Sequence, residues 1–146
     1  MSYGDYILSR WTAASNDLLQ FTTFTMEDFA INWHHRVVAR KLMDVLEGRT
    51  KRLMIFQQPR TGKSELVTRR FPAFGLGHFP DKKFMVAAYG SDLANSFNVD
   101  CQKIMTSVDY QHIFPNTQLP SISTSKTRTK FKETANLAEI VDRPGS

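Results

Sequence analysis

The stretch FQQPRTGKSE, from Phe56 to Glu65, decides how the rest of the chain is interpreted. It follows the apolar run LMIF and ends in Gly-Lys-Ser, the close of the phosphate-binding pattern G-x-x-x-x-G-K-[ST]. Gln57 stands where that pattern has its first glycine. An apolar strand before the loop and the helical sequence ELVTRRF after it favour a nucleotide site, whereas a bare Gly-Lys-Ser also occurs in surface turns.

Each part of such a loop has its own chemistry. Backbone N–H groups surround the phosphates at the positive end of the next helix, a lysine contacts the β- and γ-phosphates, and a hydroxyl ligates Mg²⁺. Gly62 would allow the close approach, Lys63 would supply the charge and Ser64 is the candidate Mg²⁺ ligand. The candidate nucleotide-binding residues are Gln57, Gln58, Pro59, Arg60, Thr61, Gly62, Lys63, Ser64 and Glu65.

Periodicity predicts an alternation of helices and strands. Apolar spacing indicates a helix at about 26–47, with a capping box from Thr25 and a stop at Gly48. Strands are expected at 53–56 and 84–89, with a helix after Lys63 and another after Ser91. This order predicts an α/β fold with parallel strands. We expect three regions: a polar and aromatic lead-in (1–24), the ATPase-like part (25–115) and a basic Ser/Thr-rich tail (116–146).

Length and composition set broad limits on the protein class. The 146 residues suffice for one domain, and the net charge of +5 favours polyanionic partners without deciding between them. Cys101 is the only cysteine, which fits a reducing cytoplasmic setting. The sequence shows neither an apolar run that could span a bilayer nor a secretory signal, so we expect no membrane association.

Residues 21–115 resemble the N-terminal ATPase region of tailed-phage terminase large subunits, the motors that package DNA into proheads. The resemblance rests on four pieces in order: NWHH, a strand feeding PRTGKSE, FPAFGLGHFPDKKF, and SDLANSF ahead of IFP. The missing first glycine is shared with the family. Gln58 departs from the two prolines with which the family's loop usually begins.

The resemblance implies a P-loop NTPase fold of the ASCE type, a parallel sheet flanked by helices, incomplete in this chain. It implies ATP and Mg²⁺ as cofactors. The implied partners are double-stranded DNA, a portal protein, a small terminase subunit and further copies in a ring, in the host cytoplasm. Lys63 and Arg60 would be the catalytic residues. Arg60 either swings onto the γ-phosphate in the transition state or pairs with an acid at the edge of the loop, and both remain open.

Two features of the family have no counterpart in the sequence. Terminase motors need an apolar strand ending in Asp-Glu, and the nearest stretch, LAEIVD, has neither a preceding apolar block nor a Glu after Asp142. The acidic nuclease domain is also missing. We therefore expect a fragment, a truncated reading frame or a short product that works without hydrolysis, and leave open whether this chain is an enzyme.

Alternatives from other classes stay open. A nucleic-acid-binding module would use the net charge and the alternating strip Lys126, Arg128, Lys130 and Lys132, although a solvated stretch explains that strip as well. A helicase-type P-loop fragment would look similar. His34 and His35 suggest a metal pair, but adjacent helical residues point about 100° apart, so we expect one against the core and one outward.

Overall fold

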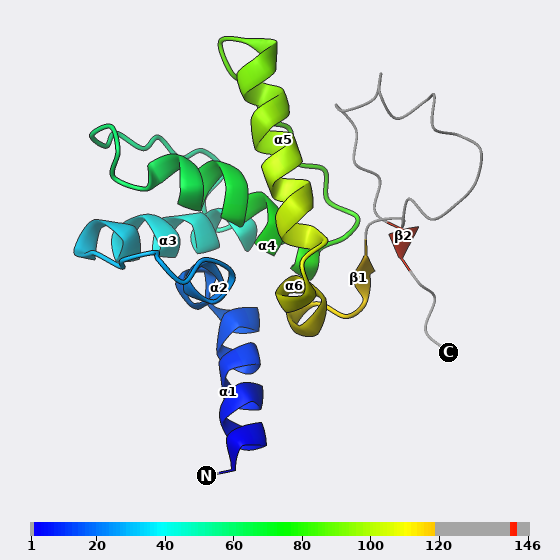
Figure 1. Cartoon of the computed structure of the whole chain (residues 1–146). Helices are drawn as coiled ribbons and strands as arrows, with labels where there is room; N and C mark the ends of the chain where they lie inside the picture. Colours follow the sequence, from blue (N-terminus) through cyan, green and yellow to red (C-terminus); the bar gives the residue numbers. More distant parts are fainter. Residues whose placement is uncertain (1, 119–140, 143–146) are drawn as a thin grey trace, which may run out of the picture.

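The computed structural model of the chain describes residues 2–118 and 141–142, which are mostly helical (Figure 1). The elements, in order, are α1 (Tyr3–Asn16), α2 (Leu18–Thr25), α3 (Trp33–Leu46), the π-helical segment η1 (Glu65–Arg70), α4 (Phe71–His78), α5 (Ser91–Met105), α6 (Val108–Ile113), β1 (Thr117–Gln118) and β2 (Val141–Asp142). The two short strands pair antiparallel, Thr117 opposite Asp142 and Gln118 opposite Val141.

The predicted parallel sheet of a P-loop fold is not present in the described residues, so the fold-class prediction is wrong. Residues 52–58 and 82–88 are not helical, and they belong to no sheet. Strands of a parallel sheet are covered on both faces. Here Met54, Phe56 and Met85 are 78%, 87% and 94% exposed. The apolar runs favour extended backbone, and in the described part no neighbouring strand completes a ladder beside them.

The core lies where α2, α4 and α6 meet. Phe21, Phe74 and Tyr110 are fully buried, and Phe114 packs against them. Ring centroids are 5.4 Å apart for Phe21 and Phe74 and 5.2 Å apart for Tyr110 and Phe114, within the range of favourable aromatic pairs. The core therefore begins within residues 1–24, since Ala14 of α1 and Leu18 of α2 are also fully buried.

Asp17 ends α1 and starts α2. Its side chain accepts hydrogen bonds from the N–H groups of Leu19 and Gln20, both at 2.9 Å, as an N-cap residue does. Thr25 is the last residue of α2, so the predicted capping box at Thr25 is wrong. The next helix starts only at Trp33, seven residues later than periodicity indicated.

The end of α3 is as expected. Gly48 has φ +79°, the left-handed conformation common just after a helix, and its N–H donates to the Val45 carbonyl at 3.0 Å. The chain then runs through residues 52–58 to the candidate loop and enters a continuous helical run at 63–78. Within that run the Phe71 N–H donates to the Leu66 carbonyl, five residues back, and Pro72 follows without an N–H to donate.

Candidate functional site

The sign of φ alternates in the loop just before the helical run. Arg60 has φ +62° and Gly62 has φ +77°, while Thr61 between them is not among the positive-φ residues. Alternating right- and left-handed conformations turn successive N–H groups toward one concave side and form an anion-binding nest. Arg60 is the only non-glycine residue with positive φ in the described part of the chain, so this turn holds a backbone conformation that side-chain-bearing residues rarely adopt.

Helix α3 holds the carbonyl of Thr61. His35 Nε2 lies 2.7 Å from that oxygen, and Nε2 of Gln57 donates to it at 3.4 Å. His35 Nδ1 accepts from the N–H of Asn32 at 3.0 Å, so the proton of the neutral ring sits on Nε2 and is donated to Thr61. Because the C=O and N–H of a trans peptide point in opposite directions, this contact aims the N–H of Gly62 away from α3.

Only glycine fits at position 62. A Cβ there would lie 2.9 Å from His35 Nε2 and 3.2 Å from a ring carbon of Phe29, and φ is positive. The structure therefore requires a glycine at this position because of side chains of the protein itself. The close approach of Gly62 to a phosphate stays a prediction.

Most N–H groups at this turn have no acceptor in the described part of the chain. Residues 59–60 form a hydrogen-bonded turn, and beyond it the first N–H that donates is that of Leu66, to the Gly62 carbonyl at 3.0 Å. These donors stand at the positive end of the helical run 63–78. The arrangement has the donor character that a phosphate group requires.

The side chains proposed for chemistry surround this turn. Lys63 is half-buried, whereas Arg60 and Ser64 are exposed. Arg60 forms no ion pair within the described residues, so pairing with an acid at the edge of the loop is not observed. The Ser64 hydroxyl likewise has no hydrogen-bond partner in that part of the chain. The donor set fits a phosphate group with Mg²⁺, which keeps most of its ligands as water and phosphate oxygens.

Glu65, included among the candidate nucleotide-binding residues, is engaged in ion pairs. Its carboxylate pairs with Arg70, and Arg69 lies 3.3 Å away. Arg70 is buried and also donates to the Thr25 hydroxyl at 3.0 Å. Burial lowers the pKa of the Arg70 guanidinium, and the Glu65 carboxylate opposes that shift. Arg70, paired with Glu65, therefore ties the helical run to α2.

Arg69 extends this network to α5. Its Nε lies 2.7 Å from Oδ2 of Asp100, and its guanidinium stands 4.9 Å from the ring centroid of Phe97. The sequence prediction assigned no role to Arg69 or Arg70. Their spacing of four and five residues from Glu65 was visible, but Asp100 is 31 residues away and only the packing brings it near.

The two histidines do not form a metal pair. His35 is buried and His34 is half-buried, their Nε2 atoms 3.1 Å apart. A metal at His35 Nε2 would need the ring proton on Nδ1, which already accepts from Asn32. Across residues 2–118 and 141–142, no group of three or more His, Cys, Asp or Glu side chains could hold a metal ion.

Two other sequence candidates fall on residues without a structural description. The basic strip from Lys126 to Lys132 lies outside the described residues. Most of LAEIVD also lies outside the described residues. Its last residue, Asp142, is in β2, which is far from the candidate loop in the sequence.

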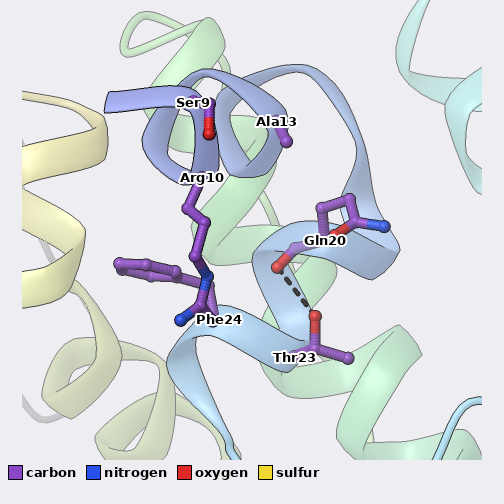
Figure 2. A pocket seen from close by; sticks show the side chains of 6 residues that line it. All are labelled: Ser9, Arg10, Ala13, Gln20, Thr23 and Phe24. Atoms are coloured by element: carbon purple, nitrogen blue, oxygen red, sulfur yellow. Dashed lines mark hydrogen bonds between the residues drawn. The ribbon is translucent and has the colours of Figure 1, made fainter. Parts of the chain in front are cut away.

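Two hollows formed by described residues lie away from the loop. One, of about 160 Å³, lies between α1 and α2, where the guanidinium of Arg10 stands 5.1 Å from the ring centroid of Phe24 (Figure 2). In it the Thr23 hydroxyl donates to the Gln20 carbonyl at 3.1 Å. The other, of about 370 Å³, lies between the start of α2 and one side of α3.

The comparisons with known proteins leave the family open. Family models, curated proteins and solved structures all fail to match the chain. In the described part, every helix is too short or too polar to cross a membrane.

Proposed function

We propose that the loop Gln57–Glu65 binds the phosphate groups of ATP with Mg²⁺. The observation that supports this proposal is the turn at Arg60–Gly62, where a hydrogen bond from His35 fixes the Thr61 carbonyl and the N–H groups that follow have no acceptor among the described residues. Lys63 adds a positive charge beside them. A parallel sheet is no part of the proposal, because a phosphate needs only the turn, the lysine and the start of a helix.

The biological role proposed with it is that of the ATP-binding part of a viral DNA-packaging motor, acting in the host cytoplasm. It rests on the resemblance of residues 21–115 to terminase large subunits. In that role the partners are double-stranded DNA, a portal protein, a small terminase subunit and further copies of the chain. For this chain we propose ATP binding and do not propose ATP hydrolysis.

Calorimetry with Mg²⁺-ATP tests the phosphate site. We expect Lys63→Ala to weaken binding at least about tenfold, since it removes a charge-assisted contact. Lys83→Ala removes the same charge from an exposed position outside the loop, and should leave affinity within about twofold. Tripolyphosphate should compete with ATP, whereas adenosine should not.

Three results would overturn the proposal. One is a folded wild type that binds no ATP. Another is equal weakening by Lys63→Ala and Lys83→Ala, which would indicate only general charge. The third is adenosine binding as tightly as ATP, which would place the site away from the phosphate loop.

A further inference from the structure

The groove between the start of α2 and α3 is lined by one stripe of α3. Arg36, Arg40, Met43 and Glu47 are spaced four, three and four residues apart, so they share one helix face. Asp17, the N-cap of α2, and Leu19 in its first turn also line the groove. Figure 1 shows α2 and α3 as neighbours, and they are in contact.

The acidic groups of this groove already have partners. Asp17 accepts from two backbone N–H groups at the start of α2. Glu47 pairs with Arg49, whose guanidinium also lies 2.8 Å from Asp44 Oδ1. These contacts neutralise the charges near Arg49. No carboxylate that lines the groove is then left to pair with the other arginines of the stripe.

Arg36 and Arg40 have no ion-pair or hydrogen-bond partner for their guanidinium groups in the described residues, and both are exposed. Like charges four residues apart on a helix cost a few tenths of a kcal/mol. Two unpaired guanidinium groups therefore face one groove at some cost to the helix. An anion bound there would relieve their repulsion.

We infer that this groove binds the phosphate backbone of a nucleic acid through Arg36 and Arg40. The planar guanidinium binds phosphate with two parallel hydrogen bonds. Two of them, about 6 Å apart along the helix axis, suit a ligand with repeated phosphates. Leu19, Ala39 and Met43 supply the apolar lining and no aromatic ring for stacking a base, so the groove suits a backbone better than a free nucleotide.

The choice of DNA as the probe rests on the proposed packaging role, but the groove does not depend on ATP binding at the loop. Fluorescence anisotropy with a duplex DNA, titrated over a range of salt concentrations, measures the contact in the full chain. We expect Arg36→Glu/Arg40→Glu to weaken binding more than tenfold and to reduce the salt slope by about 2. Arg36→Gln/Arg40→Gln should weaken it less, in the same direction.

The matched control is Lys51→Glu/Arg52→Glu, which makes the same charge change at two exposed residues outside the groove. It should cost less than about threefold, since charges outside the groove act on the DNA only at long range, where salt screens them. Equal losses in both double variants, or no loss in the groove variant, would overturn the inference. Loss of heparin or anionic-vesicle binding with intact DNA binding would overturn it in favour of another polyanion.

Mg²⁺-ATP calorimetry on the same proteins separates the two proposals. A groove variant that loses DNA but keeps its ATP affinity supports the groove. A wild type that binds DNA through the groove but no ATP would sink the proposed function and leave the groove standing.

Discussion

His35 Nε2 lies 2.7 Å from the carbonyl oxygen of Thr61, 26 residues further along the chain. The same imidazole accepts the Asn32 N–H through Nδ1, so one buried ring joins the start of α3 to the candidate loop. The hydrogen bond from this ring fixes the Thr61 carbonyl of the loop. Gly62, which follows directly, packs against the ring.

His35→Ala should destabilise the fold by about 2–3 kcal/mol, because it removes two hydrogen bonds and leaves a cavity. His35→Phe keeps the shape of the ring and should recover part of the loss. Urea unfolding measures both. His34 is half-buried and lies 3.4 Å from the Thr61 oxygen, so His34→Ala should cost less than about 1 kcal/mol. A similar cost for His34→Ala and His35→Ala would contradict this account.

The ion pair of Glu65 and Arg70 should be the most costly to break in its network. The side chain of Arg70 is 9% exposed and that of Arg69 is 24% exposed. Arg70→Met leaves Glu65 short of a partner and should cost about 2–4 kcal/mol in thermal or urea unfolding. Arg69→Met should cost about 1 kcal/mol or less.

A double variant provides the check on this pair. Glu65→Gln/Arg70→Met removes both charges, so it should be less destabilised than the sum of the single variants. Additive losses would mean that the two side chains act independently.

Two glycines should respond to alanine with opposite signs. A Cβ at Gly77 would lie 2.5 Å from the ring of Phe114, so Gly77→Ala should destabilise by about 1–3 kcal/mol. Gly4 lies in the first turn of α1, and its nearest atom would be the Ser2 hydroxyl at 3.8 Å. Gly4→Ala should stabilise by about 0.4–1 kcal/mol through a less flexible unfolded chain. The melting temperatures of the two variants test this prediction. Shifts of the same sign in both variants would refute it.

Alkaline pH should weaken the fold through Cys101. Burial raises the pKa of its thiol from 9.0 to about 11. The folded chain keeps the thiol neutral, so this stabilisation is complete below pH 9, where the unfolded thiol is also neutral, and is lost as pH rises toward 11. Burial also raises the pKa of Tyr110, whose hydroxyl donates to the Ala73 carbonyl, and its contribution is lost at still higher pH.

The free energy of unfolding should therefore fall between pH 9 and 11 in the wild type and fall less in Cys101→Ala. At pH 8 the native thiol should react slowly with iodoacetamide and quickly in urea. Rapid labelling of the folded protein, or an unchanged pH profile in Cys101→Ala, would disprove the assignment.

Local signals in the sequence predicted some of this structure. Gly48 marks the end of α3, and a helix was expected after Ser91, because caps and helical periods are properties of neighbouring residues. The structure has that helix, α5, but its N-cap is Gly90 and Ser91 is its first residue. The sheet was predicted from apolar runs at 53–56 and 84–89. Such runs favour extended backbone, but a strand exists only where a second one pairs with it.

The sites show the same division between local and long-range information. Gly62 and Lys63 were found from their motif, whereas the hold of His35 on Thr61 depends on how α3 packs against the loop. The arginine groove depends on the approach of α2 to α3, and the pairing of Thr117 with Asp142 joins residues far apart in the sequence. No spacing rule within one helix reveals such contacts.

The two ends of the candidate loop are supported unequally. Its downstream end enters the helical run 63–78, which the Glu65–Arg70 pair fastens to α2. Its upstream end continues residues 52–58, where Met54 and Phe56 face outward while Leu53 and Ile55 are partly buried against the core. The loop is therefore anchored by charged side chains at its downstream end and by alternate apolar side chains at its upstream end.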